Sequence, residues 1–191
     1  MASLDSNELL HLAMDSANRN QHGEAVSYLK QALEIDPDQA QVRFFLGAEY
    51  AQIGMMDRAA EAMAQALETD PSLEIARFQL GLLHLTSARP AEASQVWGPL
   101  GDLPADHPLH CFKNGLEALA RDEFDACRTW LGKGMALNTS NAPLNGDMQK
   151  VLDAIQDQSG APPSAPDANA ESSQNEGEHV FVSAYKGNTQ H

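Results

Sequence analysis

The sequence predicts an all-α fold that consists of four consecutive helix-turn-helix units, and three observations support this. A step of 34 residues joins Gly47 to Gly81 and Gly81 to Gly115, and the same step joins Pro37 to Pro71. Small and apolar residues recur at the same offsets around each of these glycines. Within each copy the apolar residues are spaced by three or four positions, as on a helix with one buried face. One helix pair cannot bury that face alone, so we expect the copies to stack into a solenoid with a continuous core.

The register of this period runs through all four copies without an insertion. In the second copy, Gly54 is expected to end the first helix, because glycine readily adopts the left-handed conformation that follows a helix. Asp57 is expected to cap the next helix with its carboxylate. That helix should end before Pro71, since proline lacks the amide proton that would continue it. The predicted repeats are residues 6–39, 40–73, 74–107 and 108–141.

The end of the chain divides into a helix and a polar tail. Residues 143–157 begin with a proline, which suits a first helical turn, and carry apolar side chains on one side. They are expected to cap the fourth repeat, so that residues 1–157 form the solenoid domain. Residues 158–191 are polar and contain several prolines, and they are expected to be disordered. Within them, residues 179–186 hold four apolar side chains that form either a docking motif or a frayed end: Val180, Phe181, Val182 and Tyr185.

The composition is strongly acidic, with a formal net charge of −15 at pH 7. Binding to nucleic acid requires clustered Lys and Arg side chains, which this sequence lacks, so we expect no nucleic-acid partner. The same charge disfavours anionic membrane surfaces. The first residues carry neither a basic leader nor a long apolar core, and no later stretch is apolar enough to span a bilayer. We therefore expect a cytoplasmic protein with no membrane partner.

No group of residues predicts catalysis, a cofactor or a metal site. The sequence shows no Ser-His-Asp arrangement, glycine-rich phosphate loop or paired carboxylates, so we expect no enzyme activity. His107, His110 and Cys111 are close in sequence, but a structural zinc site would need a fourth ligand and usually shows paired ligands elsewhere. Cys111 and Cys127 are the two cysteines of the chain, and we expect a reduced core pair rather than a redox pair.

One set of small and apolar positions recurs from copy to copy. In the second copy these positions hold Leu46, Gly47, Tyr50, Ala59, Met63, Ala66 and Pro71. These offsets in a 34-residue unit resemble the tetratricopeptide repeat, and in particular the small bacterial-type adaptors of that family. The resemblance implies that the first helices line a concave groove and that their second, fifth, ninth, twelfth and thirteenth positions contact ligands. The groove residues predicted on this basis are Leu10, Met14, Phe44, Ala48, Phe78, Leu82, Leu85, Phe112 and Leu116.

Two interpretations of this apolar stripe are possible. Large apolar residues at helical spacing often pack in a core, and neighbouring first helices touch each other. Alternatively, Phe44, Phe78 and Phe112 form a ladder that accepts an apolar helix or extended segment of a partner protein. We favour the second interpretation, because an open apolar groove would promote association unless a partner filled it. The chain's own segment 180–185 is another candidate occupant, since a linker of about twenty residues can reach back to the groove.

The sequence therefore predicts a non-catalytic scaffold or adaptor that binds another protein. The stretch VRFFLGAEYAQIG is similar to the second repeat of type III secretion chaperones of the translocator class, which makes a chaperone function the first alternative. Those chaperones cradle apolar segments in their groove, but they usually have three repeats and no such tail. A regulatory subunit that contacts an enzyme through its tail is a further alternative.

Overall fold

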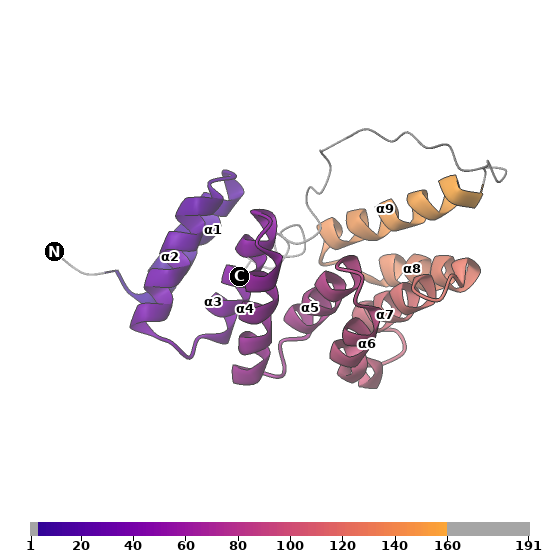
Figure 1. The fold of residues 1–191 in the computed structure, drawn as a ribbon, viewed down its shortest axis with the longest axis horizontal. Helices are drawn as coiled ribbons and strands as arrows, with labels where there is room; N and C mark the ends of the chain where they lie inside the picture. Colours follow the sequence, from indigo (N-terminus) through magenta and orange to yellow (C-terminus); the bar gives the residue numbers. More distant parts are fainter. Residues whose placement is uncertain (1–3, 160–191) are drawn as a thin grey trace. The chain divides into compact units, whose positions relative to one another are not determined.

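The computed structural model describes residues 4–159, and its regular elements are all helical (Figure 1). In this part of the chain, eight α-helices form four hairpins and a ninth α-helix follows them. The predicted all-α helical-repeat fold, with four helix-turn-helix repeats and a final capping helix, is therefore confirmed. The chain divides after Pro104 into two compact units, which are described separately.

The first unit contains three hairpins. Its elements are α1 (Ser6–Asn18), α2 (His22–Ile35), α3 (Ala40–Gln52), α4 (Met56–Thr69), α5 (Glu74–Thr86), α6 (Pro90–Trp97) and the 3₁₀ helix η1 (Gly98–Asp102). Besides the pairing within each hairpin, α2 packs against α3 and α4 packs against α5. Helix α6 has 8 residues where α2 and α4 have 14. It passes into η1 at Gly98, and Pro99, the next residue, cannot donate the backbone hydrogen bond that would continue an α-helix.

The second unit contains one hairpin and the final helix, namely α7 (Pro108–Leu119), α8 (Phe124–Leu137) and α9 (Ala142–Ser159). Helix α9 extends slightly beyond the predicted range at both ends and packs against α8. Its side chains Leu144, Met148 and Ile155 are buried, as expected of a helix that covers the end of a repeat.

The 34-residue period is preserved in the backbone. The first helices of the hairpins begin one period apart, at Ser6, Ala40, Glu74 and Pro108. Each hairpin turn contains one residue in the left-handed conformation, with φ of 59°, 77°, 57° and 57° at Asn20, Gly54, Ala88 and Asp122. In every turn, the amide that follows this residue donates to the carbonyl five residues before it, at 2.8–2.9 Å. The prediction that Gly54 terminates the first helix of its repeat is confirmed.

The start of α4 differs from the prediction. The helix begins at Met56 with Met55 as its N-cap, and the cap makes no side-chain hydrogen bond. The carbonyl of Met55 already accepts from the amide of Ala59, at 2.9 Å, which places Asp57 inside the first turn. The prediction that Asp57 caps α4 is therefore wrong, because the turn geometry fixes the start one period after His22, the first residue of α2. The carboxylate still lies near the positive end of the helix dipole.

The glycines that define the period lie where paired helices touch. A Cβ atom at Gly47 would lie 2.8 Å from Met63 Cγ, and one at Gly81 would lie 2.1 Å from Trp97 Nε1. At either separation, the neighbouring side-chain atoms would have to move to make room for the added Cβ atom. The hairpins are therefore held at a distance that only glycine permits at these two positions.

Three asparagines fix α9 to the end of α8. The Asn138 amide donates to the carbonyl of Asn141 at 2.7 Å and to Asn145 Oδ1 at 2.8 Å. The Asn145 amide donates back to the carbonyls of Asn138 at 3.0 Å and Met135 at 3.3 Å. Asn141 Oδ1 accepts from the amide of Leu144 at 3.1 Å and so caps α9. Asn138 is 6% exposed, and these bonds offset the cost of burying its amide group.

Candidate partner-binding face

The phenylalanines of the predicted stripe lie on the first helices and are buried. Phe44 is 2% exposed, and Phe78 and Phe112 are 0% exposed. The Phe78 ring stacks on Trp97 of α6, with 5.9 Å between ring centroids, and Trp97 Nε1 donates to the Phe78 carbonyl at 2.9 Å. A Cβ atom at Gly134 of α8 would lie 2.5 Å from the Phe112 ring. Phe78 and Phe112 therefore pack in the interiors of their own hairpins.

The other stripe residues differ in how much surface they expose. Four of them are buried: Leu10, Ala48, Leu82 and Leu116. Two others, Met14 on α1 and Leu85 on α5, are half-buried. We refer to the stripe positions of α1, α3 and α5 in the first unit as the first-helix face, and Met14 and Leu85 are its most accessible members. That a partner binds these residues stays a prediction.

Uncharged polar residues flank the first-helix face, and the sequence argument did not use them. The second and thirteenth repeat positions border the stripe on each first helix, and five of these six positions in the first unit carry an amide or a hydroxyl group. They are Asn7, Asn18, Gln41, Gln52 and Thr86. All are exposed except Gln52, which is half-buried. The repeat register itself could have identified them, since it assigns both positions.

One buried carboxylate lies at the contact between the first two hairpins. Glu49 of α3 is 4% exposed, and its Oε2 lies 2.9 Å from Nδ1 of His22 on α2. Burial raises the pKa of Glu49, and the hydrogen bond and charge of His22 oppose that shift. Nothing in the sequence pattern linked these two residues, because they belong to different repeats.

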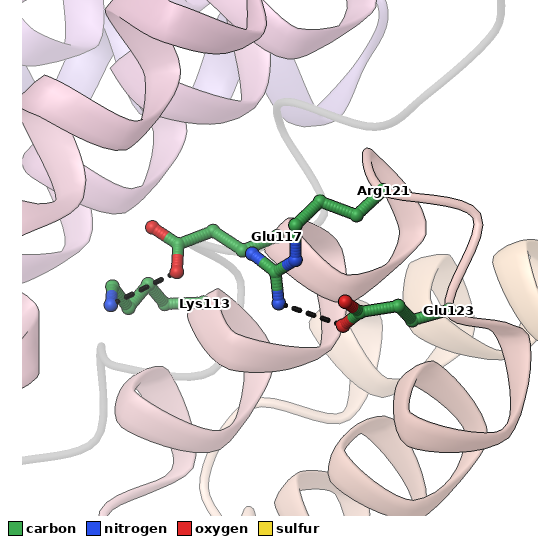
Figure 2. A network of polar contacts seen from close by, with 4 residues as sticks. All are labelled: Lys113, Glu117, Arg121 and Glu123. Atoms are coloured by element: carbon green, nitrogen blue, oxygen red, sulfur yellow. Dashed lines mark hydrogen bonds and ion pairs between the residues drawn. The ribbon is translucent and has the colours of Figure 1, made fainter.

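Charged residues on the second unit pair with one another along α7 (Figure 2). Lys113 Nζ lies 3.1 Å from Glu117 Oε2, and Arg121 Nη2 lies 2.9 Å from Glu123 Oε2. The hydrogen bond from Arg121 lowers the pKa of Glu123. The Arg121–Glu123 pair is exposed and contributes little to stability, whereas the side chains of Lys113 and Glu117 are only 15% and 17% exposed.

The histidines and cysteines near the start of α7 have local structural roles. His107 Nδ1 accepts from the amide of Leu109 at 3.3 Å, so His107 caps α7. The ring of His110 contacts that of Trp130, with 6.1 Å between centroids. Cys111 is a free thiol that is 0% exposed, and burial raises its pKa above the ordinary value. Within residues 4–159 no cluster of His, Cys, Asp or Glu has the arrangement of a metal site.

Two further observations concern the predicted tail motif and the possibility of a membrane-spanning helix. The predicted docking motif, Val180, Phe181, Val182 and Tyr185, lies outside the described residues. In the part of the chain that the structure describes, every helix falls short of the length and apolar character needed to cross a membrane.

Comparison with known proteins identifies the repeat. Residues 18–79 match the family model described as tetratricopeptide repeat, and solved proteins of this kind share the fold. The match covers 62 of the 191 residues, and the four hairpins of residues 4–159 have the helical-repeat fold. No curated protein matches its sequence.

Three solved structures illustrate how far the fold of this chain resembles that of other proteins. The crystal structure of MamA has 18% identity and a TM-score of 0.59, over 72% of this chain and 80% of that one. A chain of the APC/C hetero-tetramer Cut9-Hcn1 has 16% identity and a TM-score of 0.71, over 81% of this chain and 30% of that one. YrrB, described as a TPR protein with an unusual peptide-binding site, has 16% identity and a TM-score of 0.57, over 81% of this chain and 80% of that one. At these identities the likeness establishes the fold alone.

Proposed function

We propose that this protein is an interaction scaffold whose first-helix face binds an uncharged, apolar segment of a partner protein. The observation that carries the proposal is the combination of an apolar stripe with uncharged polar flanks on α1, α3 and α5. Amide side chains both donate and accept hydrogen bonds, so they can pair with the backbone of an extended segment. The tetratricopeptide fold supports a scaffold function, and YrrB shows by its description that one protein of this fold has a peptide-binding site.

The accessible members of the face suit such a ligand. Met14 is half-buried, and an unbranched thioether side chain adapts its shape to different apolar partners. Leu85 is half-buried at the twelfth position of the third copy. The buried phenylalanines then form the support beneath these residues, and the polar flanks fix the direction of the bound segment.

Selection of peptides on the full chain tests this proposal. A random peptide library panned against the wild-type protein should enrich sequences that are apolar and carry no net charge. A variant with Met14→Glu and Leu85→Glu should bind the enriched peptides at least tenfold more weakly, because each substitution places an unpaired charge against an apolar ligand. Isothermal titration calorimetry with one enriched peptide provides the affinity, and circular dichroism confirms that the variant is folded.

Ile35→Glu is the matched control. Ile35 is 55% exposed and lies on the second helix α2, so this change adds a charge to an accessible apolar position that is not part of the first-helix face. Equal affinities for the face variant and the control would contradict the proposal, as would enrichment of strongly charged peptides.

The same titration tests whether the chain's own apolar segment competes for this face. We propose that Val180, Phe181, Val182 and Tyr185 resemble the partner segment. A full-length variant with Phe181→Ser and Tyr185→Ser should then bind the enriched peptide more tightly than the wild type. Unchanged affinity would show that the tail does not compete with the peptide for this face.

A further inference from the structure

The contact between His22 and Glu49 joins two repeats. His22 is the first residue of α2 in the first hairpin, and Glu49 lies on α3 in the second. The 2.9 Å separation between Nδ1 and Oε2 is that of a good hydrogen bond. The side chain of Glu49 is 6% exposed and that of His22 is 21% exposed. The carboxylate is thus largely withdrawn from water, while the imidazole can still exchange protons with solvent.

Within residues 4–159, the cationic side chains near this carboxylate have other partners. Of the nearby cationic side chains, Lys30 of α2 and Arg58 of α4 lie over the ring of Tyr50, at 5.9 and 5.8 Å from its centroid. Arg43, on α3 itself, donates to Gln65 of α4 and to the carbonyl of Pro37. Among the described residues, His22 is the side chain whose charge and hydrogen bond act on the pKa of Glu49.

The equivalent positions in the other repeats show that this arrangement is particular to the second copy. One period before Glu49 lies Asp15, which is exposed, and one period after it lies Leu83, which is buried and apolar. Two periods after Glu49, Glu117 pairs with Lys113 of the same helix. The repeat fold therefore does not require a buried carboxylate here, and the cross-hairpin ion pair needs another explanation.

We propose that His22 and Glu49 form a proton-controlled latch, which holds the first hairpin on the second most firmly in mildly acidic solution and loosens as the pH rises. A neutral Glu49 carboxyl group is buried at little cost, whereas the charged carboxylate depends on its contact with His22. This inference goes beyond the proposed function and needs no partner, although the latch joins α2 to α3, and α3 carries part of the first-helix face.

The direction follows from the buried carboxyl group. Because burial raises the pKa of Glu49 in the folded protein, the stability that this carboxyl contributes is fully present below its ordinary pKa of 4.5 and is lost as the pH rises through the raised value. Above that range the carboxylate is charged, and its contact with His22 opposes the cost of burying it. Deprotonation of Glu49 therefore loosens the contact between the hairpins.

Hydrogen exchange on the full chain tests the latch. Protection factors of the α1 and α2 amides, corrected for the intrinsic exchange rate, should fall about tenfold between pH 5.5 and pH 8 in the wild type, which corresponds to one pKa unit of linkage. In Glu49→Gln, which keeps a hydrogen-bond acceptor and cannot ionise, the corrected factors should change less than about threefold. Glu34→Gln removes one negative charge from an exposed position of α2 and should behave as the wild type.

A pH dependence that is the same in Glu49→Gln and in the wild type would overturn the latch. If Glu49→Gln does not fold, His22→Gln provides the second variant, because its amide can donate to Glu49 but lacks the charge that opposes the raised pKa of the carboxyl group. The fall in protection should then persist and begin at a higher pH than in the wild type. A wild-type profile that is itself flat would also overturn the proposal.

Discussion

The second and fourth hairpins have the same backbone but different interiors. In both, the turn residue adopts a left-handed conformation and the same backbone hydrogen bond closes the turn. Where the two helices of each hairpin meet, however, Gly47 of α3 faces Met63, whereas Gly115 of α7 faces Leu131. A Cβ atom added at Gly115 would lie 2.5 Å from Leu131 Cδ2. The comparison shows that the close approach of the two helices is common to both hairpins, while the side chain that faces the glycine differs.

A second contrast concerns one carbonyl group that recurs with the period. The carbonyls of Pro37 and Pro71 accept from Arg43 and Arg77, each six residues later in the chain. One period further on, the carbonyl of Ala105 accepts from Cys111 Sγ at the same register position, at 3.6 Å, and from Lys133 Nζ of the second helix, at 2.8 Å. The acceptor is thus retained, while the charged donor comes from the second helix in place of the arginine on the first.

The largest expected effect comes from removing a buried phenylalanine in either unit. Phe78→Ala and Phe112→Ala should each lower the free energy of unfolding by about 3–5 kcal/mol, because each ring is fully buried and leaves a cavity. Urea unfolding followed by circular dichroism measures both. A loss below about 1 kcal/mol for either variant would mean that its ring does not fill the interior, and would favour a direct role in binding.

A smaller effect is expected from adding a methyl group where the two helices of a hairpin meet. Gly81→Ala should destabilise the protein by about 1–3 kcal/mol, because the new methyl group would displace the Trp97 indole, which is 1% exposed. Gly23→Ala is the matched control, since nothing lies within 4 Å of its added Cβ. Thermal unfolding should separate the two variants, and similar midpoints for both would contradict the close approach inferred where these helices meet.

The smallest effect concerns the hairpin turns. Ala88 is the one alanine among the four left-handed turn residues, with φ of 57°. Ala88→Gly should stabilise the protein by about 1 kcal/mol, since glycine adopts this conformation without a steric penalty. Asp122→Gly should change stability less, because aspartate tolerates the left-handed region. A destabilised Ala88→Gly variant in chemical denaturation would show that the loss of chain entropy outweighs the relief of strain.

The period in the sequence was sufficient to predict the fold. It predicts where the first helix of each repeat begins, because every copy repeats the same close contact between its two helices and the same turn. It did not predict the left-handed conformation of Ala88, since alanine gives no turn signal by itself. The cap at Asp57 was wrong because a residue type that favours caps also occurs within first turns.

The site was less accessible to sequence reasoning than the fold. Helical periodicity shows that Phe78 and Phe112 share a register position, but not whether the chain covers that position. Their burial depends on Trp97 and on the glycine at position 134, which come from the second helices. The contact of His22 with Glu49 and the asparagine network around Asn138 join different elements, so they appear only when the helices are packed.

The two tryptophans of the chain lie one in each compact unit. Trp97 is sealed in the interior of the first unit, with its indole proton bonded to a backbone carbonyl, whereas Trp130 is half-buried beside a histidine and a lysine in the second. Indole emission moves to longer wavelengths as the ring becomes exposed to water. The molecule therefore carries its own pair of fluorescent reporters, and replacing either one with phenylalanine allows the melting of one unit to be followed without interference from the other.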